Sequence, residues 1–305
     1  MGNFVYRAFG LTLWSGFPLE GLARGDPAAP TDLVIAQATF GPDCPSEPGL
    51  HQWGGGALLS VPRAGRFLCT GGSRIAVEPE AHAPQGNVQL FLFGSAMGLI
   101  LHQRGLLPLH ANALQVGAQA IAFMGPSGAG KSTLTAWYAE QGHRIIADDV
   151  SVVGTDGAGR PFVQPGLARI RLWRQALESL GGNPDNHSRS LVGNAGFDKF
   201  DVAVSPCSIS DGPVPLRAIC LLQFGPAPAV TRLTGIDALE ALYENTYRGA
   251  FVTVTGAAQP HWESCVHLSR TVPVLRTVRP ESLPDLGQHA RAMIAEVLKA
   301  TERQA

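Results

Sequence analysis

The sequence has little charge and lacks the features that would place it on nucleic acid or in a membrane. Only 15% of its 305 residues are Asp, Glu, Lys or Arg, and the formal net charge is −1. Proteins that bind nucleic acid or anionic membranes carry an excess of Lys and Arg, so the charge balance argues against both partners. The longest apolar run, residues 88–101, is too short to span a bilayer and predicts a buried helix capped by Asn87.

Cysteine is also scarce, and its spacing excludes two kinds of site. The five cysteines form no C-x-x-C pair, so neither a zinc site nor a disulfide framework is expected. They are Cys44, Cys69, Cys207, Cys220 and Cys265. The first residues lack a basic segment followed by an apolar core, so no signal peptide is expected. These absences together predict a cytoplasmic protein.

The most informative stretch that is present is a phosphate-binding loop with the pattern G-x-x-x-x-G-K-S/T. It consists of Gly125, Pro126, Ser127, Gly128, Ala129, Gly130, Lys131, Ser132 and Thr133. The apolar residues 121–124 enter it as a buried strand would, and residues 134–141 leave it as a helix that ends at Gly142. This order of strand, loop and helix is the context that the motif requires.

The chemistry of such a loop follows from its residue types. Glycine lets the backbone approach a ligand closely, so that successive N–H groups and the positive end of the helix face phosphate oxygens. Lys131 would reach the β- and γ-phosphates, and Ser132 would hold Mg²⁺. The sequence therefore predicts a nucleoside triphosphate, ATP in the kinase interpretation below, together with Mg²⁺.

The chain divides by composition into two predicted domains. Residues 1–85 are expected to form a small β-rich accessory domain, and residues 86–305 an α/β domain with the phosphate loop. The candidate strands of the first domain are residues 5–14, 32–39, 57–61 and 74–77, separated by connections rich in Pro and Gly.

In the second domain, the expected sheet departs from that of a regular P-loop NTPase. Residues 107–116 and 144–147 are predicted strands, and the second is expected to lie beside the strand that enters the loop. Residues 150–153 and 160–164 flank a Gly-rich turn and predict a hairpin, which makes the sheet mixed or antiparallel. A strand over 216–224 and helices over 236–247 and 286–298 complete the expectation.

Three groups outside the loop are candidates for chemistry. Asp148 and Asp149 follow the predicted strand 144–147, where one carboxylate could bind Mg²⁺ and the other could accept a proton. His110 precedes the loop and is the third candidate, although a histidine in such an apolar context is also consistent with a core residue.

The arginines at 169, 171 and 174 are expected to form a solvated face or to meet a phosphate or acidic peptide.

Residues 142–149, Gly-His-Arg-Ile-Ile-Ala-Asp-Asp, closely resemble the G-H-R-L-V-A-D-D segment of the HPr kinase/phosphorylase family. The spacing also resembles that family, because Asp149 lies 18 residues after Lys131 and His110 lies 21 residues before it. The resemblance implies an HPr-kinase-like P-loop core. It also implies roles: Asp149 as the general base for a serine hydroxyl, Asp148 and Ser132 as Mg²⁺ ligands, Lys131 on the transferring phosphoryl group, and His110 orienting the site.

The chain also departs from this family's pattern. Thr133 stands where the family usually has an acidic residue, and residues 164–173 stand where a metal-binding glutamate is expected. The family's late P-G-R-N arginine has no clear match, and Arg248 is the candidate substitute. These departures favour a substrate other than HPr.

Further motifs resemble a divergent group of HPr-kinase-like proteins that occur with lasso-peptide biosynthesis genes. They lie at residues 6–11, 94–98, 171–173 and 215–219. The resemblance implies an ATP- and Mg²⁺-dependent serine kinase that acts on a peptide or small protein, with a lasso-peptide precursor as the candidate, and the family carries the expectation of a homo-oligomer. Two alternatives stay open: an HPr(Ser) kinase/phosphorylase, and a nucleotide-binding sensor or scaffold with little or no catalysis.

Overall fold

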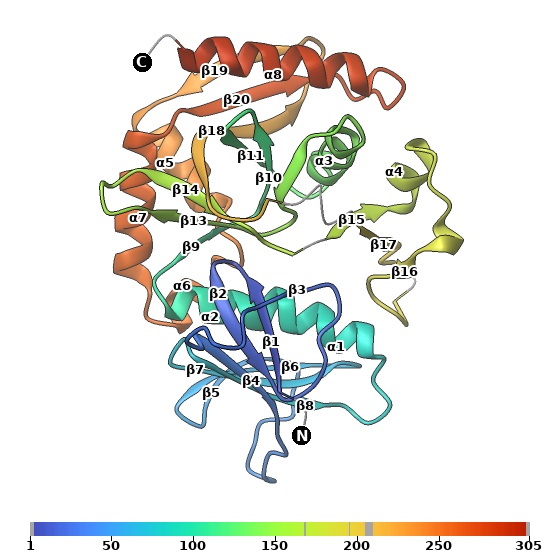
Figure 1. Cartoon of the computed structure of the whole chain (residues 1–305), viewed down its shortest axis with the longest axis vertical. Helices are drawn as coiled ribbons and strands as arrows, with labels where there is room; N and C mark the ends of the chain where they lie inside the picture. Colours follow the sequence, from blue (N-terminus) through green and yellow to red (C-terminus); the bar gives the residue numbers. More distant parts are fainter. Residues whose placement is uncertain (1–2, 168, 195, 205–209, 303–305) are drawn as a thin grey trace.

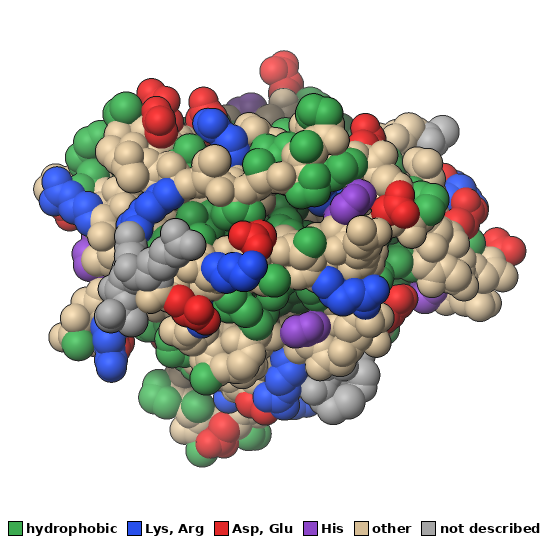
Figure 2. Space-filling view, turned by 90° about the horizontal axis from the view of Figure 1, so that it is seen from above, with side chains coloured by type: hydrophobic (Ala, Val, Ile, Leu, Met, Phe, Trp, Pro, Cys, Tyr) green, Lys and Arg blue, Asp and Glu red, His purple; other side chains and the backbone are tan. Residues whose placement is uncertain are grey.

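The structure is a computed structural model that describes residues 3–167, 169–194, 196–204 and 210–302, and Cys207 lies outside these ranges. It confirms a mixed α/β fold, in which two large sheets lie at opposite ends of the molecule with a long helix between them (Figure 1). No helix among the described residues is long and apolar enough to cross a membrane. On the face that Figure 2 shows, charged side chains of both signs are interspersed.

The first sheet contains the first eight strands in the order β3-β1-β2-β4-β8-β7-β6-β5. They are β1 (Phe4–Ala8), β2 (Leu11–Ser15), β3 (Ala23–Arg24), β4 (Leu33–Gln37), β5 (Gly49–Trp53), β6 (Gly56–Val61), β7 (Gly65–Thr70) and β8 (Arg74–Pro79). The strand predicted over 5–14 is a hairpin instead, because Phe9 and Gly10 both adopt positive φ and reverse the chain. Strands β3, β5 and β7 were not predicted from the sequence.

The helix predicted over 88–101 is longer and has three parts, α1 (Gln85–Phe91), the π-helical turn η1 (Leu92–Ala96) and α2 (Met97–Gln103). Its apolar side chains share one hydrophobic cluster with the first sheet, including Tyr6, Leu13 and Leu92. The expectation that Asn87 caps this helix is wrong, because Pro84 is the N-cap residue and Asn87 lies buried inside the first turn. The domain boundary at residue 85 stays a prediction.

The second sheet is mixed, with strands in the order β12-β10-β11-β18-β14-β13-β9 and with β20 and β19 beyond β18. They are β9 (Leu107–Leu109), β10 (Ala111–Val116), β11 (Gln119–Met124), β12 (Arg144–Ala147), β13 (Ser151–Thr155), β14 (Pro161–Gln164), β18 (Val214–Phe224), β19 (Ala229–Leu233) and β20 (Val274–Arg279). The pairs β11–β18 and β18–β20 are parallel, while β13–β14 is the predicted antiparallel hairpin.

Helices cover both faces of this sheet. The helices are α3 (Lys131–Glu140), α5 (Gly235–Glu244), α6 (Phe251–Val254), α7 (Ala258–Thr271) and α8 (Leu286–Glu302). One hydrophobic cluster joins the sheet to α5 and α7, and a second joins the other face to α3 and α8. The phosphate loop thus lies between a central strand of the sheet and a helix that packs on it.

Two expectations about the strands around the loop are wrong. The strand β12 does not lie beside β11, because β10 lies between them and is antiparallel to both. The carboxyl ends of β11 and β12 still meet at one edge, since two strands antiparallel to a third run parallel to each other. The strand predicted over 107–116 is two strands that break at His110, so that β9 pairs with β13 while β10 pairs with β11 and β12.

A small three-stranded sheet beside α3 was not predicted from the sequence. It contains β15 (Arg169–Trp173), β16 (Ser188–Arg189) and β17 (Lys199–Ala203), and it is accompanied by α4 (Arg174–Ser179) and the 3₁₀ turn η2 (Pro184–Asn186). Ile170, Leu172 and Phe200 bury this sheet in the same cluster as α3. The arginines do not form one solvated face, because Arg169 and Arg171 pair with Asp201 in the sheet.

We expect Asn87→Ala to destabilise the protein by about 2 kcal/mol, because it leaves buried backbone groups unpaired. The Asn87 amide donates to the carbonyl oxygens of Arg63 and Val192, and its own oxygen accepts from the Val192 N–H at 2.8 Å. Urea denaturation measures the change. Gln85→Ala on the exposed side of the same helix is the control and should change the free energy of unfolding little; equal stability of the two variants would contradict the prediction.

Candidate functional site

The phosphate loop lies between the end of β11 and the start of α3, as its sequence context predicted. Gly125 and Gly130 have φ of 144° and 82°, values that residues other than glycine rarely adopt. A Cβ at residue 125 would also lie 2.9 Å from the carbonyl oxygen of Leu222 on the neighbouring strand. The backbone of the loop therefore needs glycine at both positions.

The side chain of Lys131 is folded over the loop. Its Nζ donates to the carbonyl oxygens of Gly125 at 2.6 Å and Pro126 at 3.2 Å. Burial lowers its pKa to about 8, and the nearby charge of Asp149 acts in the opposite direction. The ammonium group is held by neutral carbonyls, so an anionic ligand in the loop would give it a stronger partner.

A buried amide, which the sequence analysis did not single out, connects the loop helix to both aspartates. Asn112 on β10 is fully buried, and its Nδ2 donates to Asp148 and to the Thr135 hydroxyl. Its Oδ1 accepts from the backbone N–H of Asp149 at 3.1 Å. That N–H can only donate, so the orientation of the amide is fixed. The only sequence signal was its place in the Leu-His-Ala-Asn-Ala segment that carries His110.

Asp148 is a buried carboxyl group beside the helix. Its Oδ2 accepts the Arg171 backbone N–H at 2.8 Å, and the Ser132 hydroxyl also hydrogen-bonds to the carboxylate. Burial and the neighbouring charge of Asp149 raise its pKa to about 6, and these hydrogen bonds oppose the shift. A nearby cation would lower this pKa and keep the group ionised.

Ser132 and Asp148 are suited to hold Mg²⁺. They provide a hydroxyl and a carboxylate oxygen close together, which is the type of ligand that Mg²⁺ shares with phosphate and water in nucleotide sites. No group of three or more His, Cys, Asp or Glu among the described residues could hold a metal by itself. The predicted metal ligands thus fit an ion that a bound nucleotide would help to coordinate.

Asp149 occupies a tight turn with φ of 69°, an unusual value for a residue with a side chain. Its carboxylate pairs with Arg171 and His110 at 3.4 and 3.5 Å. Burial by itself would raise its pKa, but the positive charges of Arg171, His110, Lys199 and Lys131 hold it below the ordinary value. The two adjacent carboxyl groups therefore differ: the pKa of Asp149 is lowered, so it is ionised at neutral pH, whereas the pKa of Asp148 is raised to about 6.

His110 lies at the break between β9 and β10, where its backbone N–H donates to the Asn245 carbonyl. Its Nδ1 lies 3.1 Å from the backbone oxygen of Asp149, and a carbonyl only accepts, so Nδ1 carries the hydrogen. Burial lowers the pKa of His110, and the charge of Asp149 opposes this shift. The Nδ1–H of His110 thus holds the Asp149 turn in place.

A cavity of about 520 Å³ opens in front of these groups. Its lining includes His110, Ser127, Asp149, Arg171, Lys199 and Arg248. The structure thus brings Arg248, the candidate substitute for a missing arginine, to the same cavity as the predicted base. Lys199 was not predicted, because its strand and the small sheet that holds it gave no sequence signal.

The helical segments α1 and η1 form another wall of this cavity through Leu90, Phe91, Gly94 and Ser95. Tyr247 packs against it closely, since a Cβ at Gly94 or Gly98 would lie 3.2 Å from the Tyr247 side chain. The motif at residues 94–98 therefore serves a close contact between the helix and the wall of the site. The π-helical turn falls at this contact, and such turns are frequent at functional sites.

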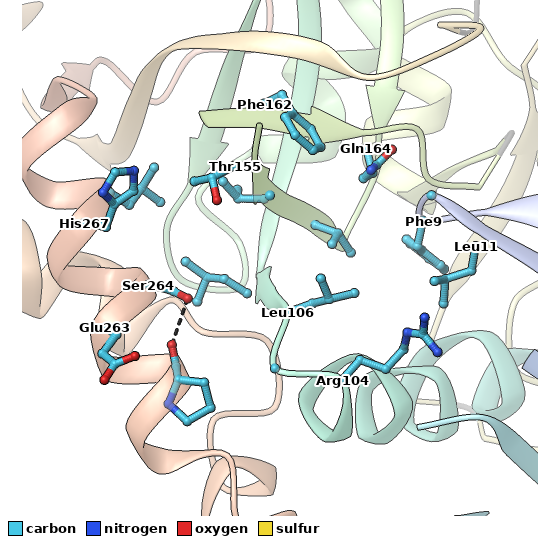
Figure 3. A pocket seen from close by; sticks show the side chains of 18 residues that line it. Phe9, Leu11, Arg104, Leu106, Thr155, Phe162, Gln164, Glu263, Ser264 and His267 are labelled. Carbon is cyan, nitrogen blue, oxygen red and sulfur yellow. Dashed lines mark hydrogen bonds between the residues drawn. The ribbon is translucent and has the colours of Figure 1, made fainter. Parts of the chain in front are cut away.

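A second cavity, of about 540 Å³, contains none of the predicted site residues. Figure 3 shows Arg104 on one side of it and Glu263, Ser264 and His267 on the other. These polar groups already have partners, since Arg104 pairs with Asp32, the Ser264 hydroxyl donates to the Pro260 carbonyl, and His267 contacts the Gly159 carbonyl. We therefore place the candidate site at the phosphate loop.

Comparison with known proteins adds little evidence about function beyond the geometry of the site. No protein-family model matches the sequence, and no curated protein matches it. Among solved structures, the HPr(Ser) kinase/phosphatase from Coxiella burnetii is similar, with 11% sequence identity over 63% of this chain and 98% of that chain. The TM-score is 0.35, so this similarity carries no argument about fold or activity. The function must be argued from the site itself.

We expect Asp148→Asn to gain stability relative to the wild type as pH rises from about 4 to 6. The folded protein keeps a proton on Asp148 up to a pKa of about 6, whereas the unfolded chain releases it near 3.8. Wild-type stability therefore falls in this window by about 1.4 kcal/mol per pH unit through this group, and the variant lacks that loss. Denaturation of both proteins without ligand at pH 4, 5, 6 and 7 measures the difference.

The introduced amide has one acceptor oxygen, so it loses either the hydrogen bond that Asp148 accepts from Asn112 Nδ2 or the one from the Arg171 N–H. This loss adds an offset that does not depend on pH, so the change with pH is the diagnostic quantity. Asp237→Asn, at an exposed position of α5, is the control and should show no such change. A constant difference between wild type and Asp148→Asn across this range would contradict the prediction.

Proposed function

We propose that the protein is an ATP- and Mg²⁺-dependent kinase that phosphorylates a serine hydroxyl on a peptide or small protein. One observation carries the proposal: the phosphate loop, through Ser127, and the ionised carboxylate of Asp149 line the same cavity. A site that binds phosphate on one side and orients a hydroxyl on the other is what phosphoryl transfer needs.

The loop side would hold the nucleotide. The backbone N–H groups of residues 127–133, at the start of α3, would bind the phosphate chain, and Lys131 would move its Nζ from the loop carbonyls to the phosphate oxygens. Ser132 and Asp148 are the groups that would hold Mg²⁺, which supplies neutralisation of phosphate charge. Lys131 then stabilises the negative charge on the transferring group.

The cavity side would hold the acceptor. A serine hydroxyl that donates its hydrogen bond to the Asp149 carboxylate has its oxygen directed at the γ-phosphorus. As the new oxygen–phosphorus bond forms, the bond from the γ-phosphorus to the bridging oxygen breaks, ADP leaves, and the hydroxyl proton passes to Asp149. A carboxylate with a low pKa suits this step, because in a loose transition state positioning contributes more than proton abstraction.

The chemical identity of the acceptor rests on the sequence resemblance. A lasso-peptide precursor is the first substrate to test, since the motifs at residues 6–11 and 94–98 resemble proteins found with such peptides. HPr is the second, and a sensor or scaffold that binds ATP without transfer is the competing class.

We expect Asp149→Asn to lower phosphoryl transfer by about 100-fold or more while ATP affinity changes only a few-fold, because the amide cannot accept the proton. Lys131→Met should weaken both transfer and ATP binding. Transfer of label from ATP to candidate peptides with Mg²⁺, and calorimetry of ATP binding, provide the two measurements. Asp237→Asn is the matched control on an exposed helix.

Other results would assign a different function. Binding of ATP by the wild type without transfer to any candidate would favour the sensor or scaffold. Phosphate-dependent release of pyrophosphate from phosphoserine-HPr would favour the kinase/phosphorylase. Equal transfer by wild type and Asp149→Asn would remove Asp149 from its proposed role.

A further inference from the structure

A buried arginine lies next to the phosphate loop on strands that the motifs did not include. Arg279 ends β20 and pairs in register with Phe224, the last residue of β18. On the other side of β18, Leu221 pairs with Met124, from which the chain enters the loop. Phe224 and Arg279 therefore lie about 10 Å beyond the Leu221–Met124 pair along the strands, which brings them alongside the loop.

The guanidinium of Arg279 reaches the last glycine of the loop. A Cβ at Gly130 would lie within contact distance of Nη2, so the absence of a side chain at residue 130 makes room for the arginine. Its guanidinium carbon lies 4.6 Å from the centroid of the Phe224 ring, which holds the group in place. Gly130 is also the residue that caps α3.

This arginine is short of partners. It is only 4% exposed, its Nε is buried without a hydrogen-bond partner, and Nη1 makes one long bond, of 3.4 Å, to the Pro280 carbonyl. Among the described residues, no carboxylate forms an ion pair with it, and the charge of Glu281 acts only at longer range. A buried guanidinium stays charged, so its charge lacks a close counterion.

The local field makes the missing counterion more costly. Arg279 lies at the positive end of the ten-residue helix α3, whose first turn contains Lys131 and no acidic residue. Cations are disfavoured at a helix N-terminus, and an anion there satisfies both the helix and the guanidinium.

We propose that Arg279 is a phosphate-binding residue of the nucleotide site and contacts the phosphate chain from the β18–β20 side of the loop. The inference rests on the nucleotide binding by residues 125–133 that was proposed above. It extends that site to the end of a strand about 150 residues later in the chain. Phe224 serves as a positioning residue for the guanidinium.

The test compares Arg279→Met and Arg279→Lys with the control Arg276→Met, an exposed arginine on the same strand. Competition against a fluorescent ATP analogue gives the affinities for ATP, inorganic tripolyphosphate and adenosine. We expect Arg279→Met to weaken ATP and tripolyphosphate at least tenfold and adenosine less than twofold, because adenosine has no phosphate. Arg279→Lys should fall between, and Arg276→Met should match the wild type.

The melting temperature without ligand separates a binding role from a structural one. Removal of a buried cation that lacks a counterion should leave the melting temperature of Arg279→Met unchanged or raise it. A lower melting temperature, a failure to fold, an equal loss of ATP and adenosine, or unchanged ATP affinity in both variants would overturn the inference while leaving the kinase proposal intact. If the wild type binds neither ATP nor tripolyphosphate, the proposed function and this inference are both wrong.

Discussion

The hydrogen bonds of Asn112 hold together the parts from which the site is built. This one buried amide lies on β10, donates to Thr135 on α3 and to Asp148 after β12, and accepts from Asp149. Its position between β11 and β12 explains why the aspartates can face the loop although their strand is not next to the loop strand. Because Asn112, Thr135 and Asp148 are buried, replacement of the amide by an apolar side chain would leave several polar groups unpaired at once.

Around this amide, the two aspartates acquire opposite acid–base character. Asp148 is enclosed and has a raised pKa, whereas Asp149 points toward cations and has a lowered pKa. Arg171 lowers the pKa of Asp149 most, followed by His110, and the small sheet supplies both Arg171 on β15 and Lys199 on β17. The small sheet that contains them therefore contributes to the lowered pKa of Asp149, in contrast to the raised pKa of Asp148.

The N-terminal half also contributes to the site. Its sheet and the helix α1–η1–α2 share one hydrophobic cluster, and that cluster includes Val150 and Val152 just after the aspartates. Gly94 and Gly98 let Tyr247 pack against the helix, and the helix in turn forms the wall of the cavity that faces Asp149. The sheet of residues 1–85, the predicted accessory domain, thus packs on the helix that forms this wall, while the wall itself belongs to residues 86–305.

The sequence alone determined the local features of the site, because they depend on short-range patterns. The glycines and lysine of residues 125–133, the strand that enters the loop, the helix that leaves it and the hairpin after Asp149 are all readable from spacing and turn residues. The two aspartates were found because they follow a predicted strand within a segment that resembles the HPr kinase/phosphorylase family, and His110 because its spacing from Lys131 resembles that family.

Only the tertiary structure decided which other residues meet these groups. Strand order and the packing of the small sheet on α3 bring four such residues to the site: Asn112, Arg171, Lys199 and Arg279. Neither the strand order nor this packing produces a periodic pattern in the sequence. The break of the predicted strand at His110 arises because β9 and β10 pair with different partners, and the burial of Asn87 arises from contacts with residues 63 and 192. Pairing and burial over such sequence separations depend on how the whole chain packs, so local propensity cannot predict them.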